Sequence, residues 1–467
     1  MYVTLCYHHV KFIIYKSSLI MKKKIITLSL ITSLLLIIMP KVLANPTSLT
    51  LESVIKDVTY LASDELKGRA NFSPEIDQAA SYIAQRFSDI GLSPINVEKN
   101  TSYKQTFTIH SIMPTSLIVT INTIDVAKEN LAMASSIRQL SWGKANIDNG
   151  SVKKHIIGNE DNMRSVLSEL NKTGGQHLVL LNTQHKSMFI RYQSYFQQGL
   201  TKLSLEHQGA IVIVLTDDDN IDSVSVEAST TISQKLLTNV VAVLPGKTKP
   251  EEVILYSSHY DHLGDNGKVN DKIFNGADDD ASGTSAVINI AQYYASKGDN
   301  ARTLIFAAFT AEEIGGFGSK YFSEQLDPAT ITAMINIEMI GKPSKFGAGS
   351  VWMTGMERSN LGQLLNENLK EQGIKIHQDP YPEQGLFYRS DNATLARLGV
   401  PAHSFSSTEL DKDEHYHKVS DDLASLDLNS MFKVIQSLAF GTQGLVDGSV
   451  TPTRIDFAKV KANGLIY

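Results

Sequence analysis

Cysteine is almost absent from this sequence of 467 residues, and its single copy, Cys6, lies close to the N-terminus. The rest of the chain therefore contains no disulfide and no thiolate for catalysis. Its stability must come from the size of its core or from bound ions. Any metal site in it must use histidine and carboxylate side chains instead of sulfur.

An excess of basic charge is also missing, since the chain has 43 basic and 49 acidic residues. Residues 1–44 hold six of the basic residues and none of the acidic ones, so the net charge of −6 becomes −12 without them. This balance argues against a nucleic-acid partner, which needs a basic surface. Two sequence patterns are missing as well, the GxSxG turn of serine hydrolases and the single-metal HExxH pattern.

The main apolar run lies near the N-terminus, in residues 21–44. Lys22–Lys24 precede an apolar segment, and Val42–Ala44 suit cleavage before Asn45, which predicts a signal peptide. We therefore expect an exported protein, periplasmic or secreted, with no stable membrane span after cleavage. An uncleaved anchor is the alternative, although the run is short for a span. Residues 1–20 precede Met21 and are interpreted as an over-extended start.

Strands and helices alternate from Thr238 onward, and apolar residues recur at helical spacing between Leu51 and Leu92. This predicts an α/β fold with a mixed, largely parallel twisted sheet covered by helices on both faces. The region between them has short alternating runs and no catalytic pattern, and it is interpreted as an inserted β-rich or α/β domain. The expected division is a signal region at 1–44, a catalytic domain at 45–100 and 234–447, the insertion at 101–233, and a peripheral tail at 448–467.

Polar side chains follow the ends of the predicted strands. The segment His259–His262 follows VILYSS, the pair Glu312–Glu313 follows LIFAAFT, and Glu338 follows TAMINI. An Asp triplet, Asp278–Asp280, leads into a helix, and Glu414–His417 comes from a later loop. Ligands bind at the carboxyl ends of strands in open α/β sheets, so we expect these groups to meet at one edge.

One metal site explains the whole set of polar residues better than a separate explanation for each motif does. Clustered carboxylates repel one another, no Lys or Arg lies within the carboxylate motifs, and a divalent cation would relieve the repulsion. Nitrogen and oxygen donors suit zinc first, and also manganese or cobalt. Taken singly, the Asp triplet suits a helix cap, the Glu pair a solvated loop, and His259, His262 and His403 ordinary histidines.

Five motifs carry a resemblance to a known family: SSHYDHLG, NGADDDASGTSA, FTAEEIGGFGS, NIEMIG and HYHKVSDD. They resemble the co-catalytic zinc exopeptidase family of bacterial leucine aminopeptidases, which is related to glutamate carboxypeptidase and glutaminyl cyclase. The resemblance covers Leu51 to Pro94 and Thr238 to about Leu445. The inserted region is only loosely similar to the protease-associated domain of some members.

The resemblance implies two zinc ions per chain and a role for each site residue. The implied metal ligands are His259, Asp279, Glu313, Glu338 and His417. Asp279 would bridge both ions and precede a cis peptide bond, and Glu312 would be the general base. Asp261 would orient the imidazole of His259. Tyr416 would donate to the oxyanion, or would simply pack as an aromatic side chain.

Glu338 departs from the family pattern, which has Asp at this position, and the change puts the recognition of the substrate amino group in doubt. We expect an aminopeptidase that hydrolyses N-terminal residues from peptides. A carboxypeptidase would need a basic pocket, for which Arg389 is the candidate. A glutaminyl-cyclase-like transferase would use one zinc ion, and a non-catalytic binding ectodomain would lose ligands.

Overall fold

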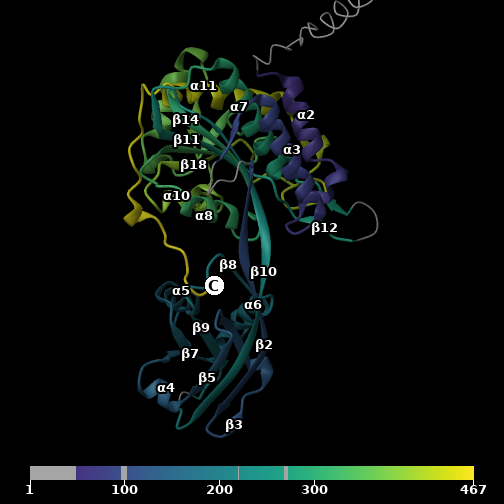
Figure 1. Ribbon diagram of the computed structural model, residues 1–467. Coiled ribbons are helices and arrows are strands. Elements are labelled where there is room, and N and C mark those ends of the chain that lie inside the picture. The colour runs from purple at the N-terminus through teal and green to yellow at the C-terminus, as the bar shows by residue number, and fades with distance from the viewer. Residues whose placement is uncertain (1–48, 96–101, 219, 268–271) are drawn as a thin grey trace, which may run out of the picture. The chain divides into compact units, whose positions relative to one another are not determined.

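The computed structural model describes residues 49–95, 102–218, 220–267 and 272–467 (Figure 1). The predicted signal peptide and its cleavage site before Asn45 lie outside these residues. In the described part of the chain, no helix combines the length and apolarity needed to cross a bilayer.

The N-terminal segment forms two helices, α2 (Leu51–Leu61) and α3 (Pro74–Ile90). The Ser73 hydroxyl caps α3 by accepting the N–H of Ile76, and Gly91 ends the helix with a φ of 86°. The predicted helical structure is confirmed, but a tight turn over 64–69 separates the two helices. Lys67 and Gly68 have positive φ there, so the helix cannot continue.

A twelve-stranded sheet forms the core. Its main path, in spatial order, is β17 (Ile376–Gln378), β16 (Val351–Met353), β18 (Ala402–Ser406), β15 (Ile331–Ile337), β11 (Lys249–His259), β14 (Arg302–Phe309), β10 (Val224–Leu244), β2 (Lys104–Ile121) and β3 (Ile124–Asp125). Three further strands pair alongside, β1 (Ser93–Pro94), β5 (Gln139–Gly143) and β8 (Leu200–Lys202). β18, β15, β11 and β14 run parallel, and β10 is antiparallel to β14, which confirms the predicted mixed sheet.

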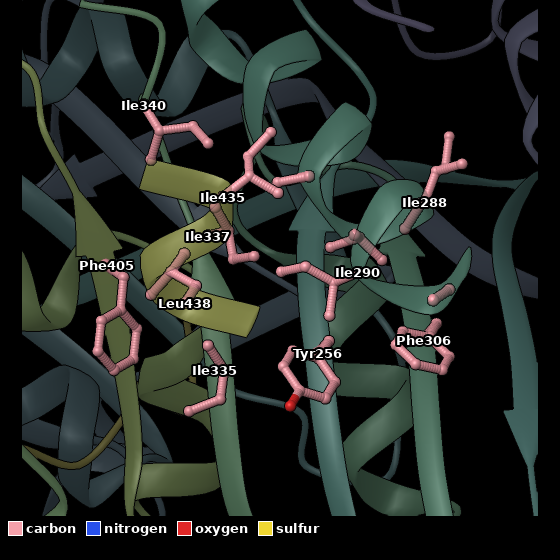
Figure 2. Close-up of a cluster of buried hydrophobic side chains, with 14 of the residues drawn as sticks. Tyr256, Ile288, Ile290, Phe306, Ile335, Ile337, Ile340, Phe405, Ile435 and Leu438 are labelled. Atoms are coloured by element: carbon pink, nitrogen blue, oxygen red, sulfur yellow. The ribbon is translucent and has the colours of Figure 1, made fainter. Parts of the chain in front are cut away.

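Both faces of the central strands are covered, because side chains along β11 alternate between two apolar clusters. Ile254 and Tyr256 join the cluster that contains α2, α3, α7 (Gly283–Lys297) and α11 (Leu428–Gly441). Val253 and Leu255 join the other, with residues of α8 (Phe317–Glu324) and α10 (Asn392–Ala396). Figure 2 shows Tyr256 of the first cluster beside Phe306 and Ile335 of the neighbouring strands. Such two-sided burial is what the apolar runs in these strands predict.

The inserted region contains a separate four-stranded sheet in the order β4 (Leu131–Ser135), β9 (Ala210–Leu215), β7 (Gln176–Leu181) and β6 (Lys153–Ile157). Residues of α5 (Met163–Thr173) and α6 (Lys186–Gln197) pack on one face of it, and α4 (Lys144–Asp148) follows β5. The predicted boundary at residue 233 lies inside β10, which pairs with β2 along its length and with β14 near its end (Figure 1). The domain division therefore stays a prediction.

The remaining elements are short. They include the hairpin β12 (Gly264–Asp265) and β13 (Ile273–Phe274), the helices α9 (Leu361–Leu369) and α12 (Gln443–Val446), and several 3-10 helices. The tail after residue 447 differs from the peripheral segment expected, since Ile455 and Ile466 are buried. Ile466 belongs to the cluster of α5 and α6, and its N–H donates to Asn171 Oδ1 at 2.8 Å. The tail has isolated apolar residues without periodicity, so its sequence does not signal this packing.

Candidate metal centre

Three parallel strands deliver the polar residues to one edge of the sheet, as the sequence predicts. β11 ends at His259, which lies opposite Phe309 at the end of β14, and Glu312 and Glu313 follow in the next turn. β15 ends at Ile337, one residue before Glu338. The parallel register therefore places the imidazole of His259 and the carboxylates at the same edge of the sheet.

Asp279 reaches this edge from the turn 277–282 that leads into α7. The peptide bond from Asp279 to Asp280 is cis, as the resemblance implies. The turn lies tightly against the sheet at Gly283, where a Cβ atom would lie 2.3 Å from the carbonyl oxygen of Ile337. Only glycine allows this approach, which brings Asp279 next to the strand ends.

The described residues contain two groups of donor atoms that could hold a metal ion, and Asp279 belongs to both. In the first group, His259 Nε2 lies 3.2 Å from Asp279 Oδ1 and 3.3 Å from Glu338 Oε1. In the second, which joins His262 to Asp279 and Glu313, His262 Nδ1 lies 2.7 Å from Glu313 Oε1 and 4.0 Å from Asp279 Oδ2. His417 lies beside this group, with its Nε2 3.2 Å from Asp279 Oδ2 and 3.3 Å from Glu313 Oε2. The structure thus brings the five sequence-predicted ligands together.

The donor set fits a pair of divalent cations. Neighbouring ligands of a tetrahedral zinc ion lie roughly 3.3 Å apart, which matches the distances of 3.2 and 3.3 Å among the five predicted ligands. Hydrogen bonds to Asp279 and Glu313 raise the pKa of His417 to about 10. Burial disfavours ionisation of Asp279, but its contacts with His259 and His417 outweigh burial and hold its pKa well below the ordinary value. The cluster therefore attracts positive charge, which a metal ion supplies without a proton.

Glu312 lies beside these groups but belongs to neither of them among the described residues. Its side chain lines the same cavity as Asp279 and Glu338. Burial raises the pKa of Glu312 well above its ordinary value, and the nearby carboxylate of Glu338 raises it further. A carboxylate with a raised pKa is suited to accept a proton near neutral pH.

Asp261 is fully buried, and its carboxylate positions the Glu312–Glu313 turn. Oδ1 accepts the N–H of Glu312 at 3.1 Å, and Oδ2 accepts the N–H of Glu313 at 3.3 Å. The imidazole of His259 is 3.7 Å from this carboxylate, and its Nδ1 instead donates to the backbone oxygen of Asp261 at 3.1 Å. The peptide carbonyl, more than the side chain, therefore fixes the His259 tautomer.

The centre opens into a cavity of about 230 Å³. Its wall includes the apolar side chains Met339, Trp352, Leu386 and Leu410. Tyr416 also lines it and stacks on the ring of His417, with ring centroids 3.9 Å apart. Burial raises the pKa of Tyr416, so the phenol stays protonated and able to donate.

One important residue was not singled out in the sequence, and another was interpreted there as an ordinary histidine. Arg69 is 1% exposed, and its guanidinium donates to four backbone oxygens, those of Leu61, Tyr260, Asn275 and Gly276. It thereby joins the loop after β11 to the loop before Asp279.

The second is His262, whose buried Nδ1 lies 2.7 Å from Glu313 Oε1. The sequence offered one signal for it, a second histidine three residues after His259. His403, by contrast, is a buried histidine bonded to Ser359 and Thr354.

Residues 239–440 match the family model described as peptidase family M28. The chain is similar to that family over this segment, called the M28 segment below, which covers less than half of the sequence. All eight sequence-predicted site residues lie within the M28 segment, and the predicted insertion at 101–233 lies outside it.

Curated proteins show the same likeness. A vacuolar membrane protease of Schizosaccharomyces pombe is 24% identical over 267 residues, which is 55% of this chain and 29% of that protein. A probable zinc metalloprotease of Pyrenophora teres f. teres is 33% identical over 134 residues, 28% of each chain. Leucine aminopeptidase 2 of Trichophyton rubrum is 27% identical over 230 residues, 43% of each. The chain spans less than a third of the first curated relatives it matches.

Among solved structures, a zinc aminopeptidase from Bacillus subtilis superposes with a TM-score of 0.50 at 14% identity. The match covers 85% of this chain and 95% of that one. It shows that the two proteins share a fold, which agrees with the mixed α/β sheet of the M28 segment.

Proposed function

We propose that the protein is a zinc-dependent aminopeptidase that uses two metal ions to hydrolyse N-terminal residues from peptides. The observation that carries this proposal is the position of Asp279, whose two carboxylate oxygens each lie 3.2 Å from a different histidine, His259 or His417. A carboxylate placed in this way suits a bridge between two cations. Zinc is the first choice, and manganese or cobalt would accept the same donors.

Each ion has its own set of residues. One would take His259 and Glu338, the other would take Glu313 and His417, and Asp279 would serve both. When bound, such ions polarise a carbonyl group and lower the pKa of bound water.

Glu312 would accept the proton of the attacking water and pass it to the nitrogen of the leaving peptide. The water oxygen would first bond to the carbonyl carbon and form an oxyanion, and the C–N bond would break when the oxyanion collapses and the leaving nitrogen takes the proton from Glu312. The Tyr416 phenol would donate to the developing oxyanion, because it lines the cavity and keeps its proton.

The charge around the cavity favours cleavage at the amino end. The carboxylates of Glu312 and Glu338 line it, and acidic groups attract a terminal ammonium. The apolar wall of Met339, Trp352 and Leu386 suits an apolar N-terminal side chain.

Arg389 supports a second candidate, a carboxypeptidase. It lines the same cavity, is exposed and makes no ion pair with any described residue, so it is free to bind a terminal carboxylate.

We further propose export, because the apolar segment at 21–44 has the pattern of a signal peptide. The catalytic domain would comprise 45–100 and 234–447, with 101–233 inserted into it. Expression of the full chain in a bacterial host tests this, since N-terminal sequencing of the exported material should return Asn45.

One experiment distinguishes an aminopeptidase from a carboxypeptidase. The protein is assayed on a panel of peptides blocked at either the amino or the carboxyl end, before and after treatment with a chelator. We expect turnover of peptides with a free amino end, loss of turnover in chelator and recovery with zinc, together with two zinc ions per chain by elemental analysis. Cleavage only of peptides with a free carboxyl end would support the carboxypeptidase, and Arg389→Met would then lose activity.

A further inference from the structure

His262 is a fully buried histidine at the metal centre that the five-ligand scheme leaves unused. It follows β11 by three residues, and its side chain has no exposed surface. The ring rests against Gly276, where a Cβ atom would lie 2.5 Å from the Cγ of His262. Its other neighbour is the ring of His417, whose centroid is 5.8 Å away at an interplanar angle of 74°. The imidazole is therefore held in a fixed place.

Neither ring nitrogen of His262 forms a hydrogen bond within the part of the chain that the structure describes. Its Nδ1 lies 2.7 Å from Oε1 of Glu313, which also forms no hydrogen bond because the two groups are not aligned for one. The two atoms are close enough for an ion pair, but neither has a hydrogen bond. A buried polar atom without a hydrogen bond costs roughly 1–3 kcal/mol, so this contact needs an explanation.

A single cation that both atoms coordinate would give each of them a partner. Two ligands at right angles around a five-coordinate zinc ion lie roughly 2.9 Å apart, close to the distance between His262 Nδ1 and Glu313 Oε1. His262 Nδ1 also lies 4.0 Å from Asp279 Oδ2, within reach of the same ion. Together with Glu313 and Asp279, His262 forms one of the two donor groups of the centre.

We propose that His262 is a ligand of the metal ion held by Asp279, Glu313 and His417. The inference rests on the two-metal function proposed above. It makes the two sites unequal, because this one has four protein ligands, whereas the site of His259, Asp279 and Glu338 has three. Four protein ligands are typical of closed structural sites, and three leave a position for water or substrate. The site that contains His262 should therefore bind its ion more tightly.

The test is a titration of metal-free protein with Co²⁺, whose visible absorption reports coordination, and with Zn²⁺ against a competing chelator. We expect the wild type to bind two ions, one more tightly than the other. In His262→Phe, the affinity of the tighter site should fall by about 100-fold or more and its absorption should change, since losing even a residue that orients a ligand costs roughly 10–100-fold. The weaker site should keep its affinity.

Two further variants show whether a loss of affinity in His262→Phe comes from a lost metal ligand. His262→Cys supplies a thiolate ligand but cannot form an ion pair with Glu313, so recovery of tight binding in this variant supports ligation. His415→Phe is the matched control, because His415 lies close to His417 in the sequence but bonds through Nδ1 to the backbone oxygen of Ser420 at 2.8 Å. It should bind both ions as the wild type does.

The outcomes distinguish this inference from the proposed function. If His262→Phe binds both Co²⁺ ions with wild-type affinity and an unchanged spectrum, His262 is not a ligand and the inference is overturned, while the two-metal function stands. A wild type that binds fewer than two ions would overturn the two-metal function itself. Thermal unfolding of metal-free His262→Phe close to that of the metal-free wild type shows that the loss is not one of folding.

Discussion

The ammonium of Lys342 lies 2.8 Å from the carboxylate of Asp413, and both side chains are buried. The two oxygens of Asp413 also accept the N–H groups of His415 and Tyr416, each at 3.1 Å. This ion pair therefore ties the segment after β15 to the loop that presents His417. His417 itself has a φ of 56°, a conformation that needs support from its surroundings.

We expect Lys342→Met to destabilise the metal-loaded protein by about 3 kcal/mol, because it leaves Asp413 buried without its counter-charge. Urea unfolding followed by circular dichroism measures this change. The matched control is Lys412→Met, which removes an exposed ion pair with Glu409 and should leave the unfolding midpoint where it was. Equal midpoints for the two variants would show that the Lys342–Asp413 pair does not stabilise this loop.

Glu312→Gln should retain both metal ions and lose turnover by roughly 10²–10⁴-fold, the usual contribution of a general base. The amide keeps the shape of the side chain but cannot take up a proton. Steady-state kinetics and metal analysis on the same preparation measure the two effects. Full turnover in this variant would remove Glu312 from the mechanism, and loss of an ion would make it a ligand instead.

Arg69→Met should destabilise the fold by about 4 kcal/mol or more, because each buried carbonyl left without its donor costs roughly 1–3 kcal/mol. Arg69→Lys should recover only part of this loss, since an ammonium cannot reach four oxygens with the geometry of a guanidinium. Chemical denaturation of the metal-free protein measures the effect without the contribution of the ions. Arg191 is exposed on α6, and Arg191→Met is the control with wild-type stability.

Burial lowers the pKa of His403 to about 4 from the 6.5 of a free histidine. As the pH falls from 6.5 to 4, the unfolded chain takes up a proton at this residue and the folded chain does not. Stability therefore declines by about 3 kcal/mol across this window through His403 alone, and not further below pH 4.

In His403→Gln, the dependence of the unfolding free energy on pH between 4 and 6.5 should be shallower by about 1.4 kcal/mol per pH unit. Denaturant unfolding at several pH values measures the slope. His207 is exposed, and His207→Gln should keep the wild-type slope. Identical slopes for the wild type and His403→Gln would show that, between pH 4 and 6.5, His403 takes up a proton in the folded protein as readily as in the unfolded chain.

Much of the M28 segment could be predicted because its signals are local. The run RTLIFAAF is buried throughout in β14, and the helix predicted from Gly283 to Ser296 ends within one residue of that position, at Lys297. The five predicted ligands come from short motifs, most of them at strand ends, so their meeting at one sheet edge follows from parallel topology.

Other features depend on distant partners and could not be seen in the sequence. β10 begins at Val224, well before the apolar run at 240–244 from which a strand is predicted. Its first half was not predicted because only one of its faces is buried, so its sequence contains many polar residues. The alternation of Val224, Val226 and Ala228 was its only signal. The position of Arg69 depends on carbonyl groups about 200 residues away, which no local pattern encodes.

The pairing of β2 with β10 has a consequence for how the chain folds during synthesis. Lys104 pairs with Val240, and the insertion lies between the two strands, so β2 leaves the ribosome long before its partner. Closing so long a loop is slow for an unstructured chain. The four-stranded sheet of the insertion contains only residues 131–215, and its early collapse would shorten that loop. We expect the region of this sheet to fold first and to bring β2 and β10 together before the predicted metal ligands are synthesised.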